Sequence, residues 1–430
     1  MLLRTLKLCA GITLLVIAVH DLSSAQSTGS TPSPTTAPPA ATTPDLMIDQ
    51  LKKAVVFIDG TYATTVTRMV NGVLTPVPVT PTQSGTGFLI FMSEPRLGEG
   101  NGLMYLVTNR HVLRKPDSAG VQGVGPYFQS MNARINTLTA AADGTQFANI
   151  PLHVVDKTGS LLWIENTTDD TVDLALTPIG LDRKEFDFKT IPADLFVTKE
   201  LLKREHVNEN DEVIFAGLFA WSPGAKKNYP IVRHGKLARL SDERVPLNRN
   251  DPSRTFEVHL ADVMSFGGNS GSPVFLRLGG VREGATSMLA GYSYYLLGVM
   301  QAFFPEGMEF AMEVTTLRGE AAQNSGIAAV IPSQKIVDLL ESPRGRSYRE
   351  RIIAETYEQN GNSVEADASF RKSIQLLETS NPDHSDLAES LEQYARFLRN
   401  HKREREAVPL EEKAKRIRAN VQTDLNQPKM

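Results

Sequence analysis

The spacing of apolar residues changes once along the chain, and this change constrains the fold more than any other feature. Up to about residue 340, apolar residues come in short runs separated by Gly, Pro, Asn and Asp, whereas after residue 346 they recur at helical spacing. Short runs between turn residues are typical of β-strands. The sequence therefore predicts an all-β region followed by a smaller all-α region. The predicted strands are AVVFI, GFLIFM, YLVTNRHVL, DEVIFAGLFA, SPVFLRL and YLLGVMQAFF.

Residues 1–25 have the pattern of a secretory signal peptide. Arg4 and Lys7 form a positive segment around the start of the apolar run LCAGITLLVIAV. The small residues Ser23 and Ala25 fit cleavage after Ala25. An uncleaved membrane anchor is the alternative, although the run is short for a spanning helix. We expect an exported protein, periplasmic or secreted, that contacts a membrane only if this segment stays uncleaved.

Residues 26–45 are rich in Ser, Thr, Pro and Ala, which is typical of an extended or disordered linker. The single cysteine, Cys9, lies in the predicted signal peptide. The mature chain would then form no disulfide and no cysteine metal site, so its stability must come from a large hydrophobic core.

Length and charge exclude some classes of protein. The 430 residues are too many for one ordinary domain, so two domains are expected. The formal net charge of −4 gives no dominant basic surface, which argues against nucleic acid as a partner. The sequence contains no cluster of metal ligands and no phosphate-binding loop, so no cofactor is predicted.

Two helix–turn–helix units are predicted within residues 347–420. The second unit repeats the first at an offset of 40 or 41 residues. Asp383 and Ser385 are candidate caps of the third helix, Pro409 falls inside the fourth, and residues 421–430 are predicted to be a disordered tail. The matching pairs are Ala354/Ala395, Tyr357/Leu398, Asn360/Asn400, Glu365/Glu406 and Ala366/Ala407.

This helical region resembles tetratricopeptide repeats of the kinesin light chain kind. The resemblance is carried by EAVPL at residues 406–410 and by the junction NPDHSDLAESL. It implies a surface that binds a protein partner, while a generic helical hairpin is the simpler interpretation. Because two units are few for a free-standing array, we expect the region to pack on the β domain or on a partner.

Three stretches supply residue types that can cleave an amide bond. His111 follows an apolar strand in YLVTNRHVL, Asp173 begins one in DDTVDLALTPI, and Ser270 lies among glycines in GGNSGSPVF. A hydroxyl nucleophile needs a base, an acceptor that orients the base, and N–H groups that face the developing oxyanion. Taken singly, the three residues have simpler explanations: a surface histidine, a cap at a strand edge and a plain turn. Their occurrence together, in the order His, Asp, Ser, favours the catalytic interpretation.

With these motifs, residues 50–340 resemble the trypsin/chymotrypsin-like serine proteases, especially the bacterial branch without disulfides. The signatures are TNRHVL, DLAL and GNSGSPV. The resemblance implies a double β-barrel over residues 46–343 that hydrolyses protein or peptide substrates. It implies that His111 is the general base and acid, that Asp173 orients it and that Ser270 forms the acyl-enzyme. The N–H groups of Gly268 and Ser270 would bind the oxyanion.

The sequence departs from the family pattern at three places. Asn109 and Arg110 stand where small residues are usual, and Ser272 replaces a glycine. Asn269 stands where members activated from zymogens carry an aspartate that binds the freed N-terminal ammonium. The resemblance therefore implies an enzyme that is not switched on by insertion of its N-terminus.

By the same resemblance, the primary specificity pocket would be formed near Met264 and by the strand that begins at Gly298. The absence of an acidic residue near Met264 disfavours a preference for Lys or Arg, and we expect a small or apolar side chain instead. The residues assigned to substrate binding are Met264, Ser265, Gly298, Gln301 and Ala302.

Three functions are consistent with the sequence. The first is an exported serine endopeptidase whose helical appendage docks proteins. The second is a catalytically inert protease fold that acts in binding through the helical repeats, and the intact triad argues against it. The third is a serine hydrolase of esters. It is disfavoured because GNSGS matches the nucleophile elbow only in part, and because the α/β pattern of that fold is missing.

Overall fold

The computed structural model of the chain describes residues 6–7, 13–14, 17–18, 46–70, 73–117, 123–157, 159–247, 251–280, 289–311, 318–380 and 385–426. Most of the predicted signal peptide and all of the linker at 26–45 lie outside these ranges, as do Cys9 and Asp383. The described parts of residues 1–25 are the two-residue strands β1 (Leu6–Lys7), β2 (Thr13–Leu14) and β3 (Ile17–Ala18). Within the described ranges, none of the helices is long and apolar enough to cross a membrane.

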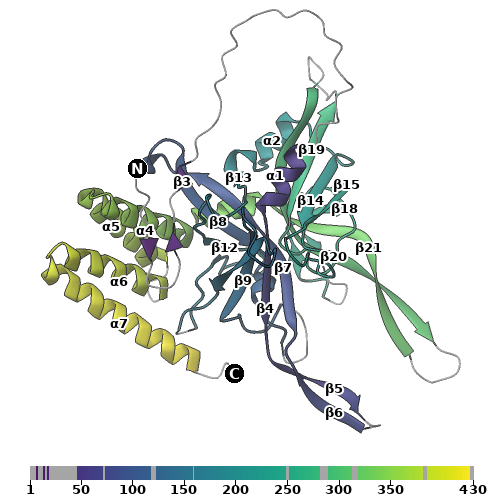
Figure 1. Cartoon of the computed structure of the whole chain (residues 1–430), viewed down its shortest axis with the longest axis horizontal. Helices are drawn as coiled ribbons and strands as arrows, with labels where there is room; N and C mark the ends of the chain where they lie inside the picture. Colours follow the sequence, from purple (N-terminus) through teal and green to yellow (C-terminus); the bar gives the residue numbers. More distant parts are fainter. Residues whose placement is uncertain are drawn as a thin grey trace, which may run out of the picture.

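The first half of the β region forms a nine-stranded sheet (Figure 1). A bridge between Val155 and Leu161 joins the segment just after β10 to the segment just before β11, which are the two ends of this sheet. The N–H of Leu162 donates to the carbonyl of Val154 at 2.9 Å, and the carbonyls of Leu161 and Leu162 accept hydrogen bonds from Arg344 and Tyr348. In spatial order the strands are β10 (Phe147–His153), β9 (Ser130–Asn136), β4 (Val55–Thr61), β7 (Thr82–Ser93), β8 (Asn101–Thr108), β12 (Ala175–Pro178) and β11 (Ile164–Glu165), with β13 (Ile191–Pro192) beside β7 and β3 beside β8.

The second half forms a closed six-stranded barrel (Figure 1). Its wall closes where β21 pairs with both β18 and β20. The predicted class, an all-β region followed by helices, is confirmed. In spatial order the strands are β14 (Glu212–Gly217), β15 (Ile231–Arg239), β18 (His259–Asp262), β21 (Arg318–Pro332), β20 (Leu289–Ala311) and β19 (Pro273–Gly280).

The central strands are buried on both faces, which explains their unbroken apolar runs. In β7, Leu89 packs into a core that belongs to the first sheet alone. Its neighbours Phe88 and Ile90 point to the other face, into a core shared with the barrel residues Ile214 and Phe275. Successive side chains of a strand point to opposite faces, so a strand between two cores needs apolar residues at every position. This shared core holds the two β units together.

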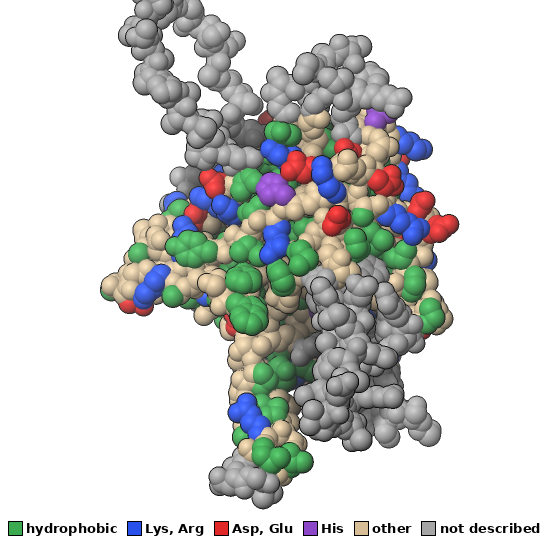
Figure 2. Space-filling view, turned by 90° about the vertical axis from the view of Figure 1, so that its right-hand side faces the viewer, with side chains coloured by type: hydrophobic (Ala, Val, Ile, Leu, Met, Phe, Trp, Pro, Cys, Tyr) green, Lys and Arg blue, Asp and Glu red, His purple; other side chains and the backbone are tan. Residues whose placement is uncertain are grey.

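Smaller elements surround these two units. The hairpin of β5 (Thr64–Val70) and β6 (Val73–Val79) extends away from the body of the molecule (Figures 1 and 2) and exposes Met69 and Leu74. The others are α1 (Leu46–Ala54), α2 (Lys199–Arg204), the pair β16 (Val245–Pro246) and β17 (Thr255–Phe256), and the 3-10 turns η1 (Pro95–Leu97), η2 (Arg110–Leu113) and η3 (Ala193–Leu195).

Five helices follow the barrel: α3 (Gln334–Glu341), α4 (Pro343–Gln359), α5 (Ser363–Ser380), α6 (Ser385–Asn400) and α7 (Glu404–Asn426). Helix α4 begins before the predicted boundary at 347, because Ser342 caps it by accepting the N–H of Gly345 and Pro343 occupies its first turn. Helix α7 runs through Pro409 to Asn426, so the predicted tail is helical up to that residue. The helices fit two hairpins, while their assignment to the tetratricopeptide type stays a prediction.

The helical region packs on the first sheet, as expected. Tyr348 and Ile352 belong to the core that the two β units share. Buried Arg344 pairs with Asp386 of α6 at 2.7 Å and donates to the carbonyl of Leu161 at 2.6 Å. Further along α4, Glu350 pairs with Arg96 at 2.9 Å. The helices are therefore part of the folded body and not a separate appendage.

We predict that Arg344→Ala destabilises the whole chain. Asp386 is only 4% exposed, so the substitution would remove a paired cation from a buried carboxylate. Breaking such a pair costs about 3–5 kcal/mol of unfolding free energy. Urea unfolding followed by circular dichroism measures this loss. Arg399→Ala, which removes an exposed pair with Glu411, is the matched control. Equal unfolding midpoints for the two variants would contradict the prediction.

Candidate active site

Asp173 lies just before β12, where its buried carboxylate meets the 3-10 turn η2. The carboxylate is bound at both oxygens by one residue of that turn. The backbone N–H of His111 donates to Oδ1 at 2.9 Å, and its ring Nδ1 lies 2.5 Å from Oδ2. A buried carboxylate is stable only when it is paired in this way. The structure thus brings together two of the three predicted catalytic residues, and it leaves the other ring nitrogen of His111 available for proton transfer.

The unusual residues before His111 hold the acid in place. Asn109 is fully buried, and its side-chain amide donates to the carbonyl of Asp173 at 2.9 Å. The backbone N–H of Arg110 donates to the same carbonyl at 3.3 Å, and its guanidinium donates to the carbonyl of Asp170 at 2.6 Å. These contacts give a physical reason for the departure from small residues, because they fasten the acid loop to the base.

The environment of His111 favours its protonated form. Burial alone would lower the pKa of this imidazole, as would the nearby charge of Arg110. The charge of Asp173 and its hydrogen bond outweigh both effects, so the pKa of His111 is raised above the ordinary value of 6.5. The raised pKa makes neutral His111 a stronger base toward the proton of a nucleophile.

Ser270 lies in a turn between β18 and β19 whose backbone only glycine adopts easily. Gly268 has φ of +97° and Gly271 has φ of +87°. A Cβ at Gly271 would lie 1.9 Å from the carbonyl oxygen of Thr86 in the first sheet. Glycine is therefore required here both by conformation and by the close approach of the two β units.

The turn leaves two N–H groups unused. Among the described residues, neither the N–H of Gly268 nor that of Ser270 donates a hydrogen bond. These are the donors predicted for the oxyanion hole. The hydroxyl of Ser270 donates to the carbonyl of Gln301 at 3.1 Å, and among the described residues no hydrogen bond joins it to His111. A nucleophile–base contact requires this hydroxyl to leave the Gln301 carbonyl.

Asn269 organises this turn from within. It is 1% exposed, and its amide nitrogen donates to the carbonyl of Leu218 at 2.7 Å. Its amide oxygen accepts the N–H of Phe266 at 2.8 Å. A carboxamide can do both at once, whereas an ionised carboxylate only accepts. The turn is thus held by a neutral side chain, without a buried ammonium group.

Strand β7 joins the base and the nucleophile, which the sequence did not reveal. The side-chain nitrogen of Gln83 lies within 3.1 Å of the carbonyls of His111 and Val112. Three positions further along the strand, the N–H of Thr86 donates to the carbonyl of Ser270 at 2.9 Å. The only sequence signal was the glycine-rich start of this strand, SGTG.

The residues predicted to bind substrate lie in different environments, and only some of them are near Ser270. Gln301 touches the nucleophile through its carbonyl, and Met264 is 44% exposed in the segment before the turn. Ser265 is buried in that segment. Gly298 pairs with strands on both sides inside the barrel wall, where a Cβ would lie 1.9 Å from the carbonyl oxygen of Ile331, so packing alone explains it. The side chain of Ala302 lies outside the described residues.

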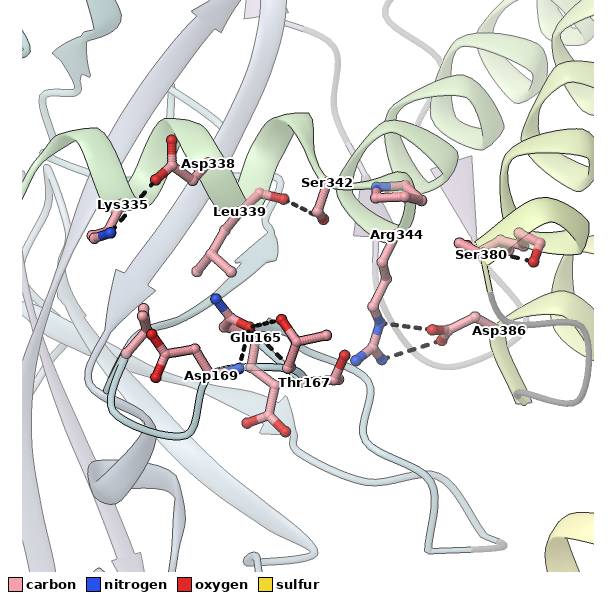
Figure 3. Close-up of a pocket in the computed structure, with 15 residues that line it drawn as sticks. Glu165, Thr167, Asp169, Lys335, Asp338, Leu339, Ser342, Arg344, Ser380 and Asp386 are labelled. Carbon is pink, nitrogen blue, oxygen red and sulfur yellow. Dashed lines mark hydrogen bonds and ion pairs between the residues drawn. The ribbon is translucent and has the colours of Figure 1, made fainter. Parts of the chain in front are cut away.

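The loop before Asp173 also lines a cavity at the helical region (Figure 3). The cavity has a volume of about 320 Å³ and lies between residues 165–172, the α3–α4 junction and the start of α6. Figure 3 shows Arg344 reaching across it to Asp386. Val172, the residue before Asp173, is part of the lining. No described set of His, Cys, Asp or Glu side chains is arranged to hold a metal ion.

A solved structure and a family model are each similar to part of this chain. A thermostable serine protease from an extremophilic microorganism is similar in structure, with 9% sequence identity and a TM-score of 0.28. The match covers 57% of this chain and 91% of that one. This likeness is too weak to support a conclusion. No curated protein matches the chain. Residues 85–281 match the family model described as a trypsin-like peptidase domain, and this range includes His111, Asp173 and Ser270. Residues 85–281 are therefore similar to a trypsin-like peptidase domain, and a helical region follows them.

Proposed function

We propose that the protein is an exported serine endopeptidase that works through His111, Asp173 and Ser270. The observation that carries the proposal is the paired contact between His111 and Asp173, made by the ring at 2.5 Å and by the backbone at 2.9 Å. The match of residues 85–281 to the peptidase family supports the same chemistry. The signal-peptide pattern of residues 1–25 supports export, to the periplasm or beyond the cell.

The proposed reaction follows from the placement of these groups. Ser270 Oγ turns from the Gln301 carbonyl to His111, gives up its proton and attacks the substrate carbonyl. The N–H groups of Gly268 and Ser270 stabilise the oxyanion. Protonated His111, held by Asp173, then donates its proton to the leaving amine. Water attacks the acyl-enzyme in the second half, again with His111 as base.

An inert scaffold is the second candidate. The hydrogen bond from Ser270 to Gln301 favours it, because the nucleophile does not contact its base in this conformation. Nucleophile–base contacts are often loose without substrate, however, and the remaining groups are assembled. Covalent labelling separates the two candidates.

We also propose that the helical region docks protein substrates. Its support is the resemblance to tetratricopeptide repeats and the exposure of single apolar side chains on the second helix of each hairpin. Val364 on α5 is 77% exposed and Val408 on α7 is 43% exposed. The region is fixed to the peptidase domain through Arg344, so a protein bound there would be held at a constant position.

We predict that a fluorophosphonate labels Ser270 of the mature protein. The label should be found on the peptide that contains Ser270 and should be lost in Ser270→Ala, because Ser270 is the hydroxyl proposed to react with His111 as its base. Peptide mass spectrometry locates the label. Ser272→Ala is the control, since this hydroxyl is buried and has no hydrogen-bond partner, and it should label normally. Folded wild-type protein that stays unlabelled would support the inert scaffold.

We predict that labelling is lost on acidification with a midpoint above pH 6.5. Neutral His111 is the active form, and its pKa is raised, so the rate falls as the pH decreases through that pKa. In Asp173→Asn the raising charge is removed and burial dominates, so the midpoint should move to lower pH. The maximal rate should fall by about 10⁴-fold. The rate of labelling between pH 4.5 and 9 measures both. An unchanged midpoint in Asp173→Asn would contradict the assigned pairing.

We predict that the double variant Val364→Glu, Val408→Glu weakens recognition of a protein and leaves the chemistry intact. Fluorescently labelled casein serves as a test substrate. Its KM should rise about fivefold while the fluorophosphonate rate is unchanged, because the loss is confined to binding. The same KM for variant and wild type would argue against docking at Val364 and Val408.

A further inference from the structure

Every polar group of Thr86 on β7 forms a hydrogen bond, although this residue lies in the first sheet and outside the predicted triad. The residue is fully buried. Its hydroxyl donates to the carbonyl of Gly268 at 2.6 Å and accepts the N–H of Leu218 at 2.9 Å. Its own N–H donates to the carbonyl of Ser270 at 2.9 Å, and its carbonyl accepts the hydroxyl of Thr108 at 2.7 Å.

Two of these hydrogen bonds hold the turn around Ser270, one at the carbonyl of Gly268 and one at the carbonyl of Ser270. The peptide between Gly268 and Asn269 is held at its oxygen by the Thr86 hydroxyl, and its N–H donates to Phe266 at 3.0 Å. This peptide lies between the two peptides that carry the free N–H groups of Gly268 and Ser270. Because a peptide is planar, holding it at both its oxygen and its N–H restrains rotation about the φ and ψ bonds on either side, which aim its neighbours.

Gly268 makes such a restraint necessary. Its φ of +97° is held without a side chain, so rotation of the adjacent peptides meets little steric resistance. A carbonyl released from Thr86 could turn toward the space that an oxyanion must occupy, and an N–H group would then turn away from it. An oxyanion hole works only when its donors are aimed before the charge develops.

We propose that Thr86 is a positioning residue whose hydroxyl holds the Gly268–Asn269 peptide and so keeps the N–H groups of Gly268 and Ser270 aimed at one point. This role rests on the proposed function of Ser270 as nucleophile. The hydroxyl acts from the first sheet on a turn of the second barrel, so the oxyanion hole depends on how the two β units are docked.

The test compares Thr86→Val with Thr86→Ser in the full mature chain, using fluorophosphonate as the probe. The phosphoryl oxygen takes the place of the oxyanion in this reaction. Loss of the hydroxyl in Thr86→Val should lower the maximal inactivation rate constant, kinact, by about 10- to 100-fold, with the half-saturating probe concentration within about twofold. Serine keeps the hydroxyl, so Thr86→Ser should stay within about threefold of wild type.

Thr108→Val is the matched control, because it removes a buried hydroxyl bonded to Thr86 but leaves the bond to Gly268. Thr86→Val and Thr108→Val should lower the urea midpoint similarly, while only Thr86→Val lowers kinact. An unchanged kinact in Thr86→Val, an equal loss in Thr86→Ser, or an equal loss in Thr108→Val would each overturn the positioning role while wild type still labels. Unlabelled wild type would instead overturn the proposed nucleophile, and the positioning role with it.

Discussion

The buried carboxylate of Asp173 is the constraint on which the rest of the site depends. A carboxylate that is 8% exposed must find donors inside the protein. His111 supplies both, one from the backbone and one from the ring, while Asn109 holds the adjacent carbonyl. The turn after β8 and the loop before β12 are therefore held in the arrangement that gives the Asp173 carboxylate these donors. That arrangement fixes the imidazole beside the carboxylate and raises the pKa of His111.

The turn around Ser270 is held in a different way, by hydrogen bonds from neutral groups. Asn269 bridges Phe266 and Leu218 with a neutral amide. Thr86 adds bonds from the neighbouring sheet to the carbonyls of Gly268 and Ser270. With asparagine at position 269, this turn holds no buried carboxylate there that would need a cation beside it. Its geometry depends instead on the docking of the two β units through their shared core.

The helices belong to the same folded body. Arg344 joins α4 to Asp386 of α6 and to the first sheet, and Glu350 receives Arg96 from that sheet. Side chains of α4 thus bond to the backbone just before β11, where Val155 and Leu161 bridge the two ends of the first sheet. The loop that leads to Asp173 lies between these helices and the candidate active site.

The sequence by itself determined the class of fold and the three candidate catalytic residues. The spacing of apolar residues distinguishes strands from helices because it shows which faces are buried. The motifs around His111, Asp173 and Ser270 are each contained in a short stretch of the chain, so they can be recognised without the fold. Only the tertiary structure decided what each face packs against. The hydrogen bond from Thr86 to Gly268 joins residues 182 positions apart, and no local pattern encodes it. The start of α4 at Ser342 and Pro343 carried a local capping signal that could have been read. The support of the turn around Ser270 carried none, since it arises from the contact between the first sheet and the barrel.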